Sequence, residues 1–452
     1  MVEPAQRLAQ RLRADATWAT VLGAIGANGP TVYVVGGTVR DLLLGRKSND
    51  FDLAIDGPAI PFARRLADAL GAAFYPMDTE RDVARVLLGP PSDGRHVDVA
   101  GLRAKGILAD LRARDFTVNA IALLPGDEAV LLDPTGGLND LEACMLRMAA
   151  PHAFVDDPLR TLRLARLRTL LSFDVDDETE QAACWAAPRL ASVTAERVRD
   201  ELLALLALPT AVDGLAYAIE LGLLTTLLPV PACSLMVALP VMHRVIEWQE
   251  AVLAGQGPRA LAPFAEQLAA HWREPLAMNR SRGLILRTAL LASLCGSMPA
   301  ARALIGDLCL SRREAQHATG ALQGAMMLRA HPSCNDVAIH RYFRRLRAAG
   351  VDGAVLALAE DSAGRAALAA RAALEGWFLR HQQVVAPPSL IDGEAVIKHL
   401  GVNPGPLVGR LLDAVREAQV AGMVTTEAQA LRFAASVLAP TDAQATTGKG
   451  DV

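Results

Sequence analysis

The sequence predicts a small α/β domain followed by a long all-α region. Its 452 residues exceed the size at which one hydrophobic core usually keeps growing, so several domains are expected. Alanine and leucine dominate, only 4% of the residues are aromatic, and β-branched stretches concentrate before about residue 130. From Asp157 onward, apolar residues recur at helical spacing. Together these observations favour a sheet domain at the start and helices afterwards.

Short β-rich runs separated by glycines predict a head domain over residues 1–150. The run TVYVV, residues 31–35, stops at Gly36-Gly37 and is followed by an apolar helical pattern that ends at Gly45. The later elements expected in the head are a strand at 51–55, a helix at 58–71, and strands at 83–89 and 95–102.

An amphipathic helix is expected to begin after a cap at Asp157-Pro158, with Leu159, Leu162, Leu164, Leu167 and Leu171 on its apolar side. Proline and glycine gather around 255–264 and 330–334, which indicates joints between helical parts. The predicted division is a neck at 151–206, a body at 207–330, a tail at 331–438 and a disordered C-terminus at 439–452.

Bulk charge and cysteine pattern set broad limits on function. The formal net charge is −4, so binding to RNA would depend on local basic patches. The six cysteines form no CxxC motif and the N-terminus lacks the apolar core of a signal peptide, so a cytoplasmic protein is expected. Residues 221–242 are uncharged and long enough to cross a bilayer, but Pro229, Pro231 and Pro240 argue against a single helix there. We expect a buried helix end plus a loop, and no membrane segment.

Three aspartates form the first candidate site. Asp50 and Asp52 are two residues apart in a strand-like run, so both carboxylates face the same way. Asp98 lies on another alternating strand, between Val97 and Val99. If the two strands are neighbours, about 4.8 Å apart, the three acids converge, and oxygen ligands favour Mg²⁺. The alternative is an ordinary solvated acidic pair at a strand end.

Gly36-Gly37 stands at a strand-to-helix turn, where the absence of side chains lets backbone N–H groups approach a triphosphate. Arg40 and Arg46 add positive charge nearby, although both are also compatible with solvated arginines on a helix surface.

Residues 36–57, GGTVRDLLLGRKSNDFDLAIDG, resemble the signature motif of the class II tRNA nucleotidyltransferases and bacterial poly(A) polymerases, in the polymerase β-like nucleotidyltransferase superfamily. RDFTVNAIAL at 114–123 resembles the second motif of that family and DPTGGLNDL at 133–141 the third. DDPLRTLRLARL at 156–167 resembles the fourth and ERVRDELLALL at 196–206 the fifth. The resemblance implies a polymerase β-like nucleotidyltransferase head followed by all-α neck, body and tail, with a tail that binds tRNA.

The resemblance also implies roles for the first candidate residues. Asp50 and Asp52 would hold two Mg²⁺ ions, and Asp98 would help to deprotonate or orient the attacking 3′-hydroxyl of the RNA. The triphosphate of CTP or ATP would be held by Gly36, Gly37, Arg40 and Arg46. The reaction implied is template-independent addition of C and/or A to a tRNA 3′ end, with release of pyrophosphate.

The second and third motifs add further candidates. Arg114 would contact phosphate, and Asp115 and Asn119 would bond the ribose 2′-hydroxyl. The alternative for the last two is a helix cap plus a surface asparagine. Gly137 would act as a hinge between head and neck.

Base choice without a template requires protein groups that imitate a Watson–Crick partner. Asp157 would accept from an exocyclic amine while Arg160 donates to a ring nitrogen, a pattern that cytosine and adenine match and that uracil and guanine reverse. The alternative for Asp157 is a helix cap before Pro158. Arg163, Arg166 and Arg168 on the same helix are candidates for phosphate contacts, and Arg163 is counted with the nucleotide-binding residues.

Two departures from the family pattern bear on specificity. Asp156 stands where the family usually has glutamate, so the residue expected to orient Arg160 is one methylene shorter. Only 15 residues separate Asp98 from Arg114, whereas CCA-adding relatives usually carry a longer flexible loop there. The short segment makes CC-only addition the leading subtype, with a separate A-adding enzyme acting on the product.

Other interpretations stay open at this stage. They are a full CCA-adding or A-adding enzyme, a poly(A) polymerase, and a retired nucleotidyltransferase that acts as an RNA-binding protein. Some relatives carry a metal-binding HD domain, but 284–300 lacks both residue types, so phosphohydrolase activity is not predicted. HRYFRRLR at 340–347 favours core aromatics with solvated arginines over RNA contacts.

Overall fold

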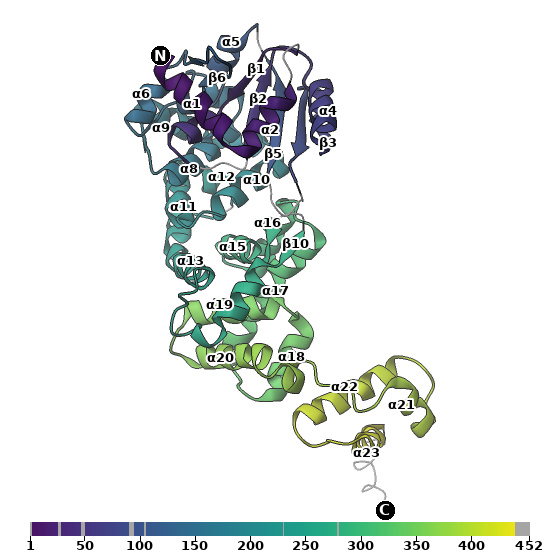
Figure 1. Ribbon diagram of the computed structural model, residues 1–452. Helices are drawn as coiled ribbons and strands as arrows, with labels where there is room; N and C mark the ends of the chain where they lie inside the picture. The colour runs from purple at the N-terminus through teal and green to yellow at the C-terminus, as the bar shows by residue number, and fades with distance from the viewer. Residues whose placement is uncertain are drawn as a thin grey trace, which may run out of the picture. The chain divides into compact units, whose positions relative to one another are not determined.

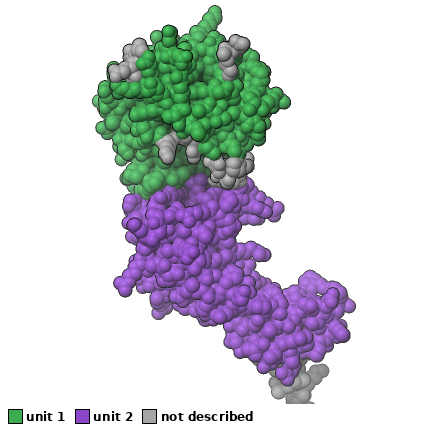
Figure 2. Space-filling view, in the orientation of Figure 1, with its two compact units in different colours: residues 1–237 green, residues 238–452 purple. Residues whose placement is uncertain are grey.

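A computed structural model describes residues 2–438, apart from 26–28, 47–49, 90–94, 104, 229 and 278–279. The predicted disordered C-terminus, 439–452, lies outside the described residues. The chain divides into two compact units, residues 1–237 and 238–452, coloured separately in Figure 2. The border between them falls inside the predicted body.

A seven-stranded mixed sheet forms the centre of the head, in the order β3-β4-β5-β2-β1-β6-β7 (Figure 1). Its strands are β1 (Val32–Val35), β2 (Asp50–Ile55), β3 (Ala73–Asp78), β4 (Val83–Leu87), β5 (His96–Gly101), β6 (Ala122–Leu124) and β7 (Val130–Leu132). β2 and β5 run parallel, while the other neighbouring pairs are antiparallel. The sheet therefore joins the two strands that carry the aspartates.

The helices of the head are α1 (Val2–Ala14), α2 (Ala16–Ile25), α3 (Gly37–Leu43), α4 (Ala59–Leu70), α5 (Ile107–Arg112) and α6 (Gly137–Glu142), with a 3₁₀ turn η2 (Thr117–Asn119). α4 ends as its sequence predicts, because Gly71 adopts the left-handed conformation that caps a helix. α1 was not predicted, although Ala5, Leu8, Ala9 and Leu12 are buried at helical spacing.

The neck helices are α7 (Ala153–Asp156), α8 (Leu159–Leu171), α9 (Asp177–Ala186), the 3₁₀ segment η3 (Ala187–Ser192) and α10 (Ala195–Leu206). Two short strands, β8 (Met145–Leu146) and β9 (Asp174–Val175), pair in parallel. All five leucines predicted for the apolar side of α8 are buried.

Residues 221–242 lie in two helices and the chain between them. α11 (Ala211–Glu220) leads into α12 (Leu223–Leu227), and α13 (Ala232–Leu253) follows. Pro240 lies inside α13, so it does not end the helix as expected, and Val237 is 80% exposed rather than buried. Among the described helices, none combines the length and the apolar character needed to cross a membrane.

The second unit is helical. After α13 come η4 (Ala262–Phe264), α14 (Ala265–Arg273), the hairpin β10 (Pro275–Ala277) and β11 (Arg280–Ser281), α15 (Arg282–Ser293), α16 (Met298–Asp307), α17 (Arg312–Ala330), α18 (Asp336–Leu346), α19 (Ala349–Glu360), α20 (Arg365–Phe378) and a π-helical turn η5 (His381–Val385). α21 (Gly393–Leu400), α22 (Pro406–Val420) and α23 (Glu427–Leu438) close the chain.

Small residues let α17 and α19 approach closely. A Cβ atom on Gly353 would lie 2.8 Å from both the Ala321 carbonyl oxygen and the Gly324 Cα. α18, α19 and α20 all pack with α17, whereas α21, α22 and α23 share a separate apolar cluster around Val396, Leu411 and Val415. The joint between helical parts that was predicted at 330–334 is therefore a turn between α17 and α18, which pack in one bundle.

Candidate active site

A cavity of about 610 Å³ lies in the first unit, between the sheet and the neck helices α8 and α10. It is lined by every predicted catalytic and nucleotide-binding residue except Arg46. Arg46 is exposed and donates to the Leu170 carbonyl oxygen at 3.1 Å. The expectation that Arg46 lies with the phosphate-binding residues is therefore not met, because the chain after α3 runs toward the end of α8.

The three aspartates converge as expected. Asp52 and Asp98 are direct partners across the parallel pair β2 and β5, and Val97 and Val99 are fully buried on the opposite face. The hydroxyl of Thr38 accepts the Asp52 backbone N–H at 2.8 Å, which ties β2 to the first turn of α3. Burial, together with the charges of Asp98 and Asp50, raises the pKa of Asp52 to about 6, although Arg114 opposes this.

This cluster of carboxylates suits a divalent cation. It offers oxygen ligands from neighbouring strands, and the burial and neighbouring carboxylates that raise the pKa of Asp52 would be offset by a bound cation. His96 lies beside the cluster, with Nε2 3.3 Å from Asp50 Oδ1 and 3.8 Å from Asp98 Oδ2. The donor set therefore fits Mg²⁺ at Asp50 and Asp52.

Arg85 is a site residue that the sequence reading missed. It lies opposite Asp98 in the register of β4 and β5, and its Nε and Nη2 atoms each donate to one Asp98 oxygen at 2.7 Å. Both arms of the carboxylate are thereby held in one plane. The alternation of VARVLLG could have placed Arg85 on the same face as Asp98, but nothing in the sequence indicates that β4 and β5 are neighbours.

The glycine turn brings backbone close to the acids. Gly36 has a positive φ of 66°, and a Cβ atom there would lie 2.9 Å from Arg114 Nη1 and 3.5 Å from Asp52 Oδ2. Only glycine fits this position without displacing the guanidinium.

A buried polar network runs from α3 into the neck. Arg40 donates to Asn119 Oδ1 at 2.7 Å, and Asn119 Nδ2 donates to Asp115 Oδ1 at 3.2 Å. Arg163 donates to Asp115 Oδ2 at 3.0 Å and also to Glu201. Asn119 is buried, which excludes a surface asparagine.

Charge in this network fixes the state of Asp115. Burial alone would raise the pKa of Asp115, but the charge and hydrogen bond of Arg163, with bonds from Asn119 and the Phe116 N–H, lower it to about 2. Asp115 is therefore ionised at neutral pH and links the head to α8.

Guanidinium groups crowd one part of the cavity. Burial lowers the pKa of Arg103, and the positive charges of Arg114, Arg81 and Arg160 lower it further against the opposing pull of Asp110. Arg103 and Arg81 line the cavity and were not predicted. Such mutual repulsion is relieved when an anion binds between the groups.

The residues predicted to imitate a base partner also line the cavity. Arg160 donates to the carbonyl oxygens of Ala113, Arg114 and Ala153 at 2.9 to 3.3 Å. Asp157 accepts from Arg197 at 2.6 Å, and its other oxygen accepts the Leu159 N–H at 3.3 Å, as a helix cap does. Arg197, on α10, was not predicted.

Asp156 was expected to orient Arg160. Its carboxylate instead lies 3.4 Å from His152 Nε2, and both side chains are more than half exposed. The carbonyl oxygens hold Arg160 in its place, so the shorter side chain at position 156 has no direct effect on Arg160 in this structure.

Gly137 begins α6, and the reason for glycine there differs from the expected one. Its φ is not positive; the left-handed residue is its neighbour Gly136, with φ 81°. A Cβ atom on Gly137 would lie 2.1 Å from the Thr117 carbonyl oxygen. Close packing of α6 on η2 therefore requires glycine at position 137, and its proposed role as a hinge remains a hypothesis.

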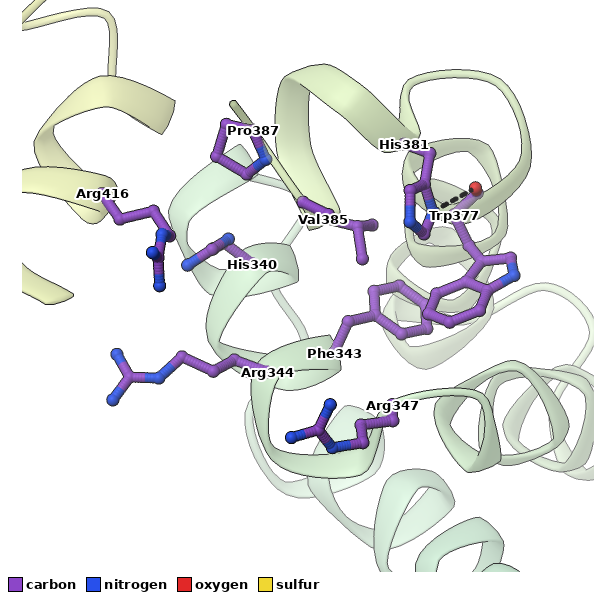
Figure 3. A pocket seen from close by; sticks show the side chains of 10 residues that line it. His340, Phe343, Arg344, Arg347, Trp377, His381, Val385, Pro387 and Arg416 are labelled. Carbon is purple, nitrogen blue, oxygen red and sulfur yellow. Dashed lines mark hydrogen bonds between the residues drawn. The ribbon is translucent and has the colours of Figure 1, made fainter. Parts of the chain in front are cut away.

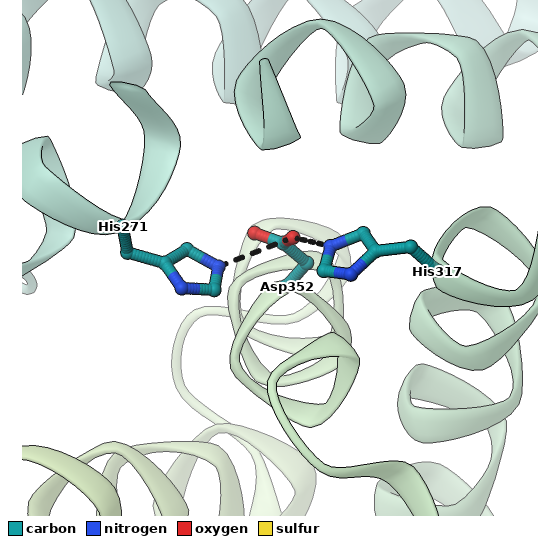
Figure 4. Close-up of side chains that lie close together, drawn as sticks. All are labelled: His271, His317 and Asp352. Carbon is teal, nitrogen blue, oxygen red and sulfur yellow. Dashed lines mark hydrogen bonds and ion pairs between the residues drawn. The ribbon is translucent and has the colours of Figure 1, made fainter. Parts of the chain in front are cut away.

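The second unit contains a buried histidine–aspartate cluster (Figure 4). His317 Nε2 and His271 Nε2 lie 2.6 Å and 3.3 Å from the same oxygen of Asp352, and Trp272 Nε1 donates to the other oxygen at 2.9 Å. Arg282 lies 3.2 Å from His271 Nδ1. Since a guanidinium only donates, His271 Nδ1 accepts from Arg282, and Nε2 is the ring nitrogen that faces the Asp352 carboxylate.

Comparisons with known proteins show the family of the chain. Residues 32–147 match the family described as "Poly A polymerase head domain", and residues 172–234 match "Probable RNA and SrmB- binding site of polymerase A". The chain is 34% identical to the A-adding tRNA nucleotidyltransferase of Deinococcus radiodurans, over 89% of this chain and 95% of the relative. It is 32% identical to the CC-adding tRNA nucleotidyltransferase of Geobacter sulfurreducens, over 89% and 91%.

A solved structure, the Thermotoga maritima CCA-adding enzyme complexed with tRNA, shares the fold with a TM-score of 0.62. That alignment covers 96% of this chain and 98% of the other, at 23% identity. The chain belongs to the family of the tRNA nucleotidyltransferases and poly(A) polymerases. The family resemblance read from the motifs, the predicted fold class and the prediction of a nucleotidyltransferase enzyme are all confirmed.

Proposed function

We propose that this enzyme adds C and/or A to the 3′ end of tRNA, from CTP or ATP, with release of pyrophosphate. The observation that carries the proposal is that one cavity holds both the Asp50, Asp52 and Asp98 cluster and the Asp157 and Arg160 pair. The first group suits phosphoryl chemistry and the second suits selection of a base, so a single bound nucleoside triphosphate would contact both.

Asp50 and Asp52 would hold Mg²⁺, which supplies stabilisation of the attacking and leaving oxygens in an in-line displacement. Of the two roles expected for Asp98, deprotonating or orienting the 3′-hydroxyl, its contacts favour the second. Arg85 donates to both of its oxygens, which orients the Asp98 carboxylate beside Asp52. We assign Asp98 to orienting the reacting groups rather than to accepting the proton of the 3′-hydroxyl.

The phosphates would lie between the glycine turn and the crowded arginines. Gly36 leaves the backbone open next to Asp52, and Arg114, Arg103 and Arg81 present positive charge in the same cavity. Anion binding there offsets charge that develops on the leaving pyrophosphate. Asp115 and Asn119 would act mainly by fixing Arg163 and Arg40, since their polar atoms already bond one another.

Asp157 and Arg160 would read the base. A carboxylate has about four lone-pair positions, so Asp157 can accept from a base amine while it keeps Arg197 and the Leu159 N–H. Arg160 is held by carbonyl oxygens, which directs the guanidinium without cancelling its charge. Uracil and guanine would leave these groups unpaired.

Two products are candidates: addition of two C nucleotides, or addition of one A nucleotide. The short segment between Asp98 and Arg114 leaves room only for α5 and a few flanking residues, which favours CC addition, with a second enzyme adding the final A. Similarity to the A-adding enzyme of Deinococcus radiodurans favours addition of a single A.

The test uses three tRNA transcripts, ending before CCA, at C and at CC, each incubated with one nucleoside triphosphate and Mg²⁺. Growth by two C residues on the first transcript identifies CC addition, and one A on the last identifies A addition. Long A tails on unrelated RNA would instead identify a poly(A) polymerase. Asp52→Ala should abolish every product. Incorporation that persists in this variant would overturn the proposed site.

A further inference from the structure

Histidines line cavities in both units, but their neighbours differ. In the second unit, a cavity of about 450 Å³ lies between α18, the α20–η5 segment and α22 (Figure 3). Its lining includes His340, His381, Arg344, Arg347 and Arg416, and no carboxylate is among the described residues that line it. The charge of the arginines would repel a cation from these histidines. In the cavity of the first unit, by contrast, a histidine lies among carboxylates.

This histidine, His96, lies on the same face of the sheet as the three aspartates. In the parallel pair β2 and β5 it stands directly opposite Asp50, and the next pair on that face is Asp52 opposite Asp98. His96 also lines the cavity. It lies outside the five sequence motifs that carry the family resemblance, so no motif assigns it a role.

The spacing between His96 and Asp50 suits two ligands of one cation. His96 Nε2 lies 3.3 Å from Asp50 Oδ1, which is longer than the roughly 2.9 Å usual for an N–H···O hydrogen bond. Donor atoms that lie about 2.1 Å from a metal ion are separated by about 3.0 Å in an octahedral arrangement and about 3.4 Å in a tetrahedral one. One cation can therefore contact both atoms without a rearrangement of either strand.

The second carboxylate beside His96 is already held by another residue. Nε2 of His96 lies 3.8 Å from Asp98 Oδ2, but Arg85 donates to both oxygens of Asp98 and ties that carboxylate to β4. The Asp50 side chain is 66% exposed, whereas that of His96 is 14% exposed. Asp50 is thus open to a cation that enters the cavity, and the donor that β5 presents to it is His96.

We propose that His96 is a nitrogen ligand of one cation at the acidic cluster, and that it raises the affinity of this site for Mn²⁺ relative to Mg²⁺. The proposal rests on the proposed function, because it takes Asp50 to be a metal ligand. Mg²⁺ is a hard ion that prefers oxygen, whereas imidazole nitrogen suits transition metals. Mn²⁺ is a transition-metal ion that also accepts carboxylate oxygens in the octahedral arrangement of Mg²⁺. It therefore fits a site that offers both kinds of donor.

The main test measures binding of Mn²⁺ alone to the full-length protein, without nucleotide or RNA. Pulsed EPR of the bound Mn²⁺ should show coupling to an imidazole nitrogen, and this coupling should be absent from His96→Gln. Glutamine keeps an N–H that can donate to Asp50, but its amide nitrogen is not a metal ligand. The Kd for Mn²⁺ should rise about tenfold or more in His96→Gln, while the Kd for Mg²⁺ should change by less than about twofold.

The matched control is His152→Gln. His152 Nε2 also lies beside a carboxylate, 3.4 Å from Asp156, but His152 is not among the described residues that line the cavity. The nitrogen coupling and both dissociation constants should stay unchanged in this variant. The spectrum of the wild type tests the proposal by itself, even if His96→Gln folds poorly.

The outcomes separate His96 from the rest of the site. Bound Mn²⁺ without nitrogen coupling in the wild type overturns the proposal. An equal rise of the two dissociation constants in His96→Gln also overturns it, because His96 would then only orient Asp50. Loss of Mn²⁺ binding in Asp52→Ala, without nitrogen coupling in the wild type, would remove His96 as a ligand and leave the acidic cation site intact. A failure of the proposed function would be seen separately, in the assay with the three tRNA transcripts.

Discussion

Arg85 and Asp98 face each other across β4 and β5 and share two hydrogen bonds of 2.7 Å, so the third carboxylate of the cluster is held by a side chain from the neighbouring strand. Asp98 in turn lies directly opposite Asp52. The orientation of the acidic cluster therefore depends on an arginine that would not touch the reacting atoms.

Arg85→Gln should lower kcat by about 10- to 100-fold, as loss of a supporting partner does at metal sites, and should raise the Mg²⁺ concentration needed for half-maximal rate. The reason is that Asp98 loses its fixed plane and can rotate toward the cation. Initial rates over a Mg²⁺ titration measure both effects. Arg85→Lys, which keeps one charged donor, should recover part of the rate. An Mg²⁺ requirement equal to that of the wild type would contradict this positioning role.

Arg197→Gln should weaken base discrimination. Asp157 would lose its 2.6 Å bond and could turn away from the base, so the ratio of kcat/KM for the correct nucleotide over UTP should fall by about tenfold or more. Single-nucleotide incorporation with each triphosphate measures this ratio. Asp156→Glu serves as the comparison: because Asp156 lies beside His152 and not Arg160, the substitution should leave the ratio unchanged.

Asp115 should make folding stability depend on pH. Its pKa is about 2 in the folded chain against 3.8 for the free side chain, so the unfolded state binds the proton more tightly. The ionised carboxylate then contributes about 2 kcal/mol above pH 4, and this contribution is lost as the pH falls through the folded pKa. Urea unfolding of the wild type and Asp115→Asn should differ most at pH 5 to 7 and by about half as much at pH 3. A difference that does not shrink at low pH would show that charge is not the cause.

Gly137→Ala should destabilise the head by about 1 to 3 kcal/mol or more, because the added methyl group meets the Thr117 carbonyl oxygen. Gly126→Ala is the matched control, since nothing lies within 4 Å of its Cβ position. Unfolding curves give the stability. If both variants are equally stable and only kcat falls in Gly137→Ala, a hinge role would explain the glycine better than packing does.

Asp352→Asn should destabilise the helical unit by about 3 kcal/mol, because the carboxylate that bonds His317 and Trp272 and lies 3.3 Å from His271 is replaced by a neutral amide. Thermal unfolding of the full chain, with and without added Zn²⁺, provides the measurement. A large stabilisation of the wild type by Zn²⁺ that is absent from Asp352→Asn would instead indicate a metal site.

Local pattern predicted much of the head. The apolar spacing and Gly71 predicted α4, and alternation predicted that Asp98 faces away from Val97 and Val99. α1 was missed although its buried residues have a regular spacing. The joint predicted at 330–334 does not separate two packing units, because α18 begins after it and still packs on α17.

The sequence by itself determined the family, the strands and helices that carry the first and fourth motifs, and the residue types at the acidic cluster, because motif spacing and periodicity are local properties of the chain. Only the tertiary structure decided which groups hold those residues. Arg85 reaches Asp98, Arg197 reaches Asp157, and Arg46 points away from the cavity, since each contact depends on which strands and helices become neighbours. The same reason applies to the histidine–aspartate cluster, whose members come from three helices far apart in the sequence.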